Sequence, residues 1–252
     1  MENKNSLLAY TLRIADDSLI LGQRLSEWCG HGPVLEEDIA LTNIALDFVG
    51  QATNLYEYAA VVANDGRTSD DFAFLRLEHE YTNVLLVEQP NGHFGDTIAR
   101  QFLFDAFRKL FYEQLTHSKD EQLSAIAAKS LMETKYHVKH SSEWLIRLGD
   151  GTELSHGRVQ ESIDDLWKFA DELFYMDEID RELIEKGIAF DLEALRQPWM
   201  EYVDMVLDLA KLEKPSSKWI FNLGRKGAHS EHMGYILTEM QYMQRAYPGM
   251  EW

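Results

Sequence analysis

The sequence predicts an all-α protein, an antiparallel bundle of long helices followed by additional C-terminal helices. Only five prolines and 15 glycines occur in 252 residues, and few of them interrupt the apolar runs. Apolar residues recur at helical spacing along most of the chain, and no convincing strand segment is found. Hydrophobic residues make up 45% of the chain, enough for a substantial core. Because no linker divides it, we expect one domain over residues 1–252.

The first two expected helices cover residues 6–29 and 36–63. Leucine and alanine residues at helical spacing give the first helix an apolar stripe. Glycines and Pro33 end it, because glycine caps helices and proline cannot continue them. The second begins with three successive acidic residues, which the helix dipole favours at an N-terminus. An Asn-Asp-Gly turn ends it.

The next three expected helices cover residues 72–87, 95–115 and 120–148. Asp96 suits the N-terminus of the middle one, whose aromatic and leucine side chains cover most of its circumference. A helix that is apolar all round is buried on several sides. These five segments therefore predict the bundle itself.

Three further segments with helical periodicity follow, at residues 158–177, 191–212 and 230–246. Pro198 must lie at a helix start or a kink, because its ring blocks the preceding helical turn. We expect these last helices to pack around the bundle.

Charge and cysteine content narrow the classes of function. The formal net charge is −19, so nucleic acid and anionic membranes should repel the chain. The single cysteine, Cys29, excludes an internal disulfide and CxxC pairs, and we expect it to serve packing rather than nucleophilic chemistry. No secretory signal and no run of about 20 apolar residues is found. We therefore expect a soluble, cytoplasmic protein.

One segment, LMETKYHVKHSSEWL, places Glu133, His137 and His140 on one helical face. A di-iron bundle needs carboxylates from two helices and Glu-x-x-His pairs from two others. Only one such pair occurs, Glu153 and His156, and it follows a helix stop where it is badly placed to reach a bundle core.

Four residues nevertheless occupy positions that resemble those of a metal bundle: Asp47, Asp105, Glu133 and His137. None of the three acids is followed by histidine at the third residue, where glycine, arginine and tyrosine stand instead. Three interpretations stay open, namely a polar network or solvated residues, the structural remnant of a metal centre, and a working metal site. The ligand count favours the first, because too few donors are present. We assign no catalytic, cofactor-binding or metal-ligating residue.

Other sites have weaker support. The chain has no GxGxxG, GxxxxGK[ST] or GxSxG motif. The segment GRKGAHSEH, residues 224–232, brings Arg225 and Lys226 close to a helix start, where an anion could bind. An ordinary turn is the simpler interpretation of the same segment.

Three long motifs resemble a known family. They are LSEWCGHGPVLEEDIALTNIALDFVGQA, ETKYHVKHSSEWLIRLGDGTELSH and HMGYILTEMQYMQRAYPGMEW. They look like the C subunits of the bacterial phenylacetyl-CoA epoxidases, multicomponent monooxygenases that form a ring 1,2-epoxide in phenylacetate degradation. The resemblance extends over essentially the whole chain.

This resemblance implies a ferritin-like fold and a non-catalytic structural role. In such systems an A subunit of similar fold carries the di-iron site, and the C subunit pairs with it. A small B subunit and a reductase subunit complete the complex. The resemblance therefore implies no cofactor in this chain, di-iron in the partner, and no activity of the chain alone.

Two alternatives belong to other classes. The chain could be a metal-dependent di-iron oxygenase or ferritin-like oxidase in its own right, with the four candidate residues around iron. It could also be an acyl-CoA binding module that uses Arg225 and Lys226.

Overall fold

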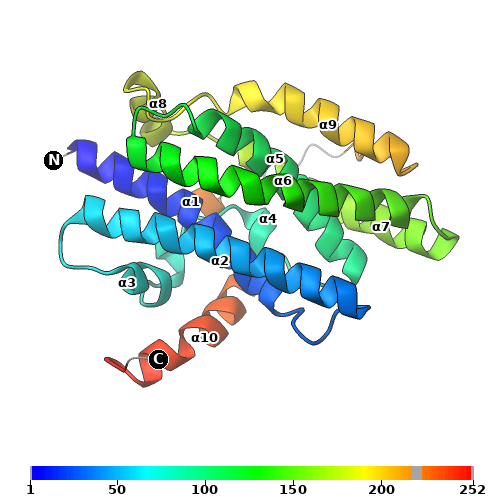
Figure 1. Ribbon diagram of the computed structural model, residues 1–252, viewed down its shortest axis with the longest axis horizontal. Helices are drawn as coiled ribbons and strands as arrows, with labels where there is room; N and C mark the ends of the chain where they lie inside the picture. The colour runs from blue at the N-terminus through cyan, green and yellow to red at the C-terminus, as the bar shows by residue number, and fades with distance from the viewer. Residues whose placement is uncertain (1, 217–222, 251–252) are drawn as a thin grey trace. The chain divides into compact units, whose positions relative to one another are not determined.

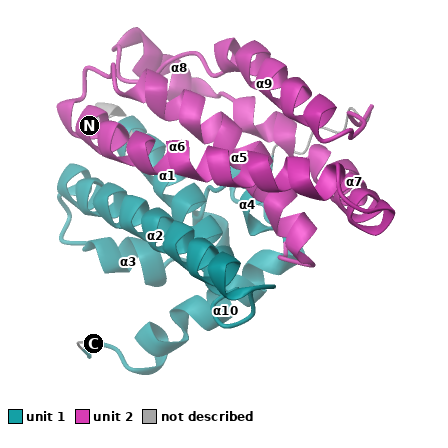
Figure 2. Cartoon of the chain, turned by 45° about the vertical axis from the view of Figure 1, so that its right-hand side comes forward, with its two compact units in different colours: residues 1–89, 223–252 teal, residues 90–222 magenta. Residues whose placement is uncertain are grey.

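The computed structural model describes residues 2–216 and 223–250, and in this part of the chain every regular element is a helix. The all-α prediction is therefore confirmed. The chain divides into two compact units (Figure 2), unit 1 with residues 1–89 and 223–252 and unit 2 with residues 90–222. The expected organisation as one domain stays a prediction, and each unit is described by itself.

Unit 1 is built on a long hairpin of α1 (Glu2–Ser26) and α2 (Leu35–Ala63), drawn in blue shades in Figure 1. The short elements α3 (Ser69–Phe74), η1 (Glu78–Glu80) and α4 (Leu85–Glu88) follow. The chain returns to this unit with η4 (Gly224–Lys226) and α10 (Glu231–Ala246), and α10 contacts α1, α3 and α4. The first and last segments of the sequence therefore share one core.

The single helix expected over residues 72–87 is wrong, because this segment splits into α3, η1 and α4. The backbone N–H groups of Thr82 and Val84 donate to the carboxylates of Asp16 and Asp17, at 2.8 and 2.9 Å. Backbone donors that serve these buried carboxylates are not free for a helical ladder. Tertiary contacts thus override a helical periodicity that the local sequence does contain.

Unit 2 contains α5 (Phe94–Leu115) and α6 (Glu121–Gly149), which lie side by side as a second long hairpin (Figure 1). It continues with α7 (Glu153–Trp167), η2 (Ala170–Phe174), α8 (Glu178–Glu185), η3 (Glu193–Leu195) and α9 (Arg196–Leu209). Both α7 and α9 contact α5 and α6. Three of the longer helices therefore pack against α5, which helps to explain why most of its side chains are buried.

The helix boundaries of unit 2 follow their caps. At α5, His93 and Asp96 form a reciprocal capping box, and at α6 Asp120 accepts the N–H of Leu123 at 2.9 Å. Pro198 lies in the first turn of α9, as expected. The short helix α8 was not expected, although Asp177 caps it by accepting the N–H of Ile179.

Two boundaries in unit 2 differ from expectation. The helix expected over residues 158–177 begins earlier, at Glu153, and ends at Trp167, before the separate turn η2. The helix expected over residues 191–212 is confined to α9, with η3 before it. Trp199 ties α9 to α5, because its indole N–H donates to the carbonyl oxygen of Leu103 at 3.1 Å.

Cys29 is exposed, so the packing role expected for it is wrong. It follows the end of α1, in the turn that leads to α2. Across the described residues, no helix combines the length and the apolar character that a membrane span requires.

Candidate functional site

The structure separates the four candidate residues. Asp47 lies half-buried on α2 of unit 1. Asp105 on α5 and His137 on α6 are buried in unit 2, and Glu133 is half-buried on α6. Since α5 and α6 are paired, the structure brings Asp105 and His137 together in one core.

Asp105 is the most unusual ionisable group of this core. Its side chain is 1% exposed, and neither carboxyl oxygen has a hydrogen-bond partner within bonding geometry among the described residues. Burial raises the pKa of Asp105 to about 7, while His137 and, less strongly, the nearby Ser141 hydroxyl pull that pKa down. The Ser141 hydroxyl itself donates to the carbonyl oxygen of His137 at 2.9 Å. Around neutral pH the Asp105 carboxyl therefore exists in both protonation states.

These donors do not fit a di-iron centre, which draws about four carboxylates and two histidines from such a bundle. Within the described residues, no three or more His, Cys, Asp or Glu side chains are grouped closely enough to hold a metal ion. Asp105 and His137 supply two donors. The Glu153–His156 pair lies at the start of α7 and completes no such group, and His156 Nδ1 lies 2.7 Å from the carbonyl oxygen of Gly149. This core can hold a proton on a buried carboxyl, and it lacks the ligands for two irons.

Unit 1 contains a buried ionic network that the sequence analysis missed. Asp16 on α1 is fully buried and pairs with Arg76, whose Nη1 donates at 3.2 Å. The hydroxyl of Tyr56 donates to the same carboxylate at 2.6 Å, and the backbone N–H of Thr82 does so at 2.8 Å. Burial and the charge of Asp16 hold the pKa of Tyr56 well above its usual range. Hydrogen bonds from three residues thus compensate one buried carboxylate.

The neighbouring Asp17 binds Arg225 in a bidentate pair, with N–O distances of 3.1 and 2.8 Å. Asp17 is 1% exposed and Arg225 is 10% exposed. The Arg225 guanidinium, which we considered as a binding group for an external anion, therefore already binds the carboxylate of Asp17. This contact removes Arg225 from the acyl-CoA binding alternative and leaves Lys226 as the exposed cation of that loop.

A third buried pair joins His229 to Glu88, with both side chains fully buried. The imidazole Nδ1 lies 2.9 Å from Glu88 Oε2, and Nε2 lies 3.0 Å from the carbonyl oxygen of Tyr81. Glu88 also accepts the N–H of Ser230 at 2.7 Å and the amide of Asn83 at 3.2 Å. Because both ring nitrogens face acceptors, the geometry favours an imidazolium that donates twice.

The pKa of His229 is set by opposing effects. Burial lowers it, but the hydrogen bond to Glu88 and the charge of Glu88 raise it more, so the pKa lies above its usual value. The sequence offered two signals for this network: adjacent acids, Asp16 and Asp17, inside an apolar helix, and the basic loop at residues 224–232. Neither signal identifies the partner, because the residues that meet are at least 60 positions apart along the chain.

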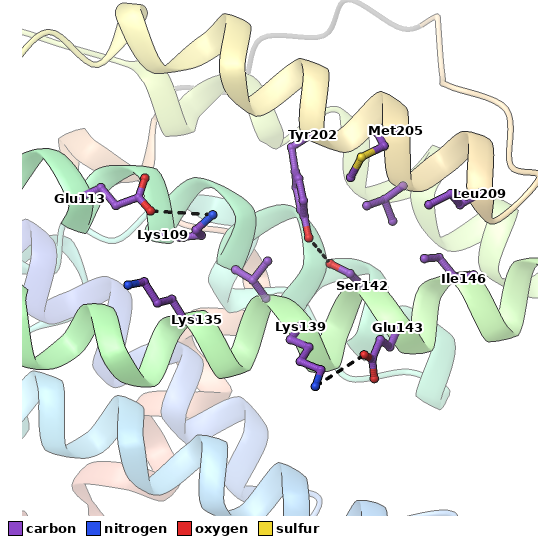
Figure 3. A pocket seen from close by; sticks show the side chains of 12 residues that line it. Lys109, Glu113, Lys135, Lys139, Ser142, Glu143, Ile146, Tyr202, Met205 and Leu209 are labelled. Carbon is purple, nitrogen blue, oxygen red and sulfur yellow. Dashed lines mark hydrogen bonds and ion pairs between the residues drawn. The ribbon is translucent and has the colours of Figure 1, made fainter.

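Unit 2 also has an open groove of about 570 Å³ between α5, α6 and α9 (Figure 3). We call it the lysine groove and define it by Lys109, Lys135, Lys139, Ile146, Met205 and Leu209. Lys109 and Lys135 lie toward one end, and the three apolar side chains lie toward the other. Between them the hydroxyls of Tyr202 and Ser142 are 3.0 Å apart and link α9 to α6. Sequence reasoning did not find this surface.

Comparison with known proteins gives consistent results. A model of the family described as "Phenylacetic acid catabolic protein" matches residues 1–252. The chain is also 50% identical over 248 residues to the C subunit of the 1,2-phenylacetyl-CoA epoxidase of Escherichia coli (strain K12). That alignment covers 98% of this chain and 100% of the relative. With the all-helical structure, these matches confirm the expected resemblance and the ferritin-like fold.

Proposed function

The chain belongs to the phenylacetic acid catabolic protein family, and we propose that it is the non-catalytic structural subunit of a phenylacetyl-CoA 1,2-epoxidase complex. In this role it pairs with a di-iron catalytic subunit and supports it in aerobic phenylacetate catabolism. The relative's name, which makes it the C subunit of an epoxidase, supports membership of a multisubunit enzyme.

The observation that carries the non-catalytic role is the composition of the unit 2 core. A di-iron bundle draws six ligands from four helices. Here α5 and α6 contribute a buried carboxyl and a buried imidazole, Asp105 and His137, and the described residues contain no group of three or more such donors. Asp105 takes a proton readily because burial raises its pKa to about 7. A proton on this carboxyl would offset the cost of burying its charge, so the core can be stable without metal.

Under this proposal the chain holds no cofactor and lacks activity on its own. Its partners are the catalytic di-iron A subunit, the small B subunit and the reductase of the complex, and it functions in the cytoplasm. A structural component of this kind stabilises its partner through a large interface, about 2,000 Å² or more in obligate complexes.

The test is to purify the chain alone and with the catalytic subunit, then to measure iron content and turnover of phenylacetyl-CoA in both preparations. We expect iron and turnover only when the catalytic subunit is present. The double variant Asp105→Asn/His137→Gln should leave both quantities unchanged in the complex. Stoichiometric iron in the chain alone, lost in this variant, would instead show that the chain is a metal-dependent oxygenase or oxidase.

A further inference from the structure

The lysine groove has the dimensions of a helix-binding surface. Its wall on α6 extends from Lys135 to Ile146, which at 1.5 Å per residue is about 16 Å, or three helical turns. Opposite this wall, α9 contributes Met205 and Leu209 (Figure 3). An elongated depression between helices is the shape into which an amphipathic helix lays its apolar face.

The apolar part of the groove exposes large hydrophobic side chains to solvent. Met205 is 49% exposed and Leu209 is 56% exposed, although Val138 and Val206, which also line the groove, are buried. Methionine is common at binding surfaces because its flexible, polarisable side chain adapts to a partner. These side chains would lose their exposed area if a second apolar face covered them.

The charged part of the groove is unusual for this protein. The chain carries a net charge of −19, yet this groove is lined by three lysines against two glutamates, Glu113 and Glu143. Lys109 and Lys139 form long, solvent-exposed pairs with Glu113 and Glu143, at 3.8 and 3.9 Å. Lys135 has no carboxylate within ion-pair distance among the described residues. Exposed pairs of this kind contribute little stability, so these lysines can turn to an external anion at small cost.

From these observations we propose that the lysine groove binds an acidic amphipathic helix of another subunit of the complex. The inference rests on the proposed function, because it assumes that the chain works within an assembly. The helix would place apolar side chains over Met205 and Leu209 and carboxylates, one or two turns away, over Lys109 and Lys135.

A helix fits better than a small acidic ligand. Small-molecule sites bury most of the ligand surface, whereas this groove leaves its own apolar residues half exposed. A helix covers the groove along its whole length and brings further contacts from the rest of its subunit. The charge pattern also gives the complex a salt-dependent association rate.

The first test is the affinity of the full-length chain for the catalytic subunit and for the small subunit, each purified separately, at low and high salt. We expect Lys135→Glu to weaken binding of one of them about tenfold at low salt, with a smaller effect at high salt. Lys129→Glu is the matched control, because Lys129 is also exposed on α6 and lies outside the groove. This control should bind within about twofold of the wild-type chain.

The second test locates the helix. A benzophenone label on Leu209→Cys, in a Cys29→Ser background, should crosslink to a helical segment rich in aspartate and glutamate. The same label on Leu154→Cys, an exposed site on α7 outside the groove, should not reach that segment.

The outcomes separate this inference from the proposed function. If the wild-type chain assembles with the catalytic subunit but Lys135→Glu binds both subunits equally well, the groove inference is wrong and the function stands. If the wild-type chain binds no subunit, the proposed function fails and the inference fails with it. If the chain alone binds phenylacetyl-CoA and Lys135→Glu abolishes that binding, the groove is a small-anion site and the helix inference is overturned.

Discussion

The cores of the two units both bury acidic side chains, but they treat the charge differently. In unit 1 the carboxylates of Asp16, Asp17 and Glu88 each face a cation, and backbone N–H groups complete their hydrogen bonds. In unit 2 Asp105 lacks such bonds, and burial raises its pKa to about 7. Burial alone therefore does not decide whether an acid stays charged. The partners that tertiary packing supplies decide it.

Among the variants that test this difference between the two cores, Asp16→Asn should have the largest effect on stability. It leaves the Arg76 guanidinium buried without its carboxylate, so we expect the free energy of unfolding to fall by about 3–5 kcal/mol. Urea denaturation measures this loss. Asp65→Asn removes the partner of Arg67 in a pair that is nearly half exposed, so it should lower the free energy of unfolding far less than Asp16→Asn does. Equal losses in the two variants would show that the buried ion pair contributes no more to the free energy of unfolding than the exposed one.

The second effect concerns Asp105→Asn, which should stabilise the protein at high pH. The folded pKa of about 7 lies above the usual value, so the wild-type protein loses stability as pH rises from about 4 to 7. The neutral amide removes that loss, and we expect a gain of roughly 2–4 kcal/mol at pH 8 and almost none at pH 4. Urea denaturation at both pH values checks this. Asp208→Asn, at an exposed position on α9, should show no such pH-dependent gain.

The third effect concerns His229 and is smaller. Here the pKa is raised by a charged partner, whereas burial raises the pKa of Asp105. The pKa of His229 is raised because its imidazolium binds Glu88, so its contribution is fully present below the unfolded pKa of about 6.5. That contribution is lost as pH rises through the raised folded pKa. His229→Gln should therefore destabilise the protein by about 1–2 kcal/mol at pH 6 and less at pH 9. The control His79→Gln, at an exposed position, should leave both values unchanged. A loss for His229→Gln that is the same at both pH values would show that its charge is not involved.

We expect the smallest effect on stability from the hydrogen bond between the uncharged hydroxyls of Tyr202 and Ser142 at the lysine groove. Tyr202→Phe and Ser142→Ala each remove one side of the hydrogen bond that links α9 to α6. We expect each change to cost about 0.5–1 kcal/mol, and the double variant to cost little more than either one. A double-mutant cycle by thermal or urea unfolding measures this coupling. Additive losses would mean that the two hydroxyls act independently.

The long helices and their caps could be predicted from the sequence. The hairpins α1–α2 and α5–α6 have strong helical periodicity and clear stop signals, and each lies within a few residues of its expected range. Asp105 could be identified as unusual, because an acid inside the apolar helix α5 has few ways to reach water. The short elements between α2 and α5 could not be predicted, because their backbone donors bind carboxylates of α1.

The sequence by itself determined the fold class, the family and the lack of the two Glu-x-x-His pairs that a di-iron bundle needs, because these depend on local periodicity and on residue spacing. Only the tertiary structure decided which buried acids are paired with a cation. Asp17 meets Arg225 across 208 positions of the chain, and Glu88 meets His229 across 141. Such contacts have no local signature, since a buried charge depends on what the fold places within a few ångströms of it. The lysine groove is a tertiary feature for the same reason, because α5, α6 and α9 form it together.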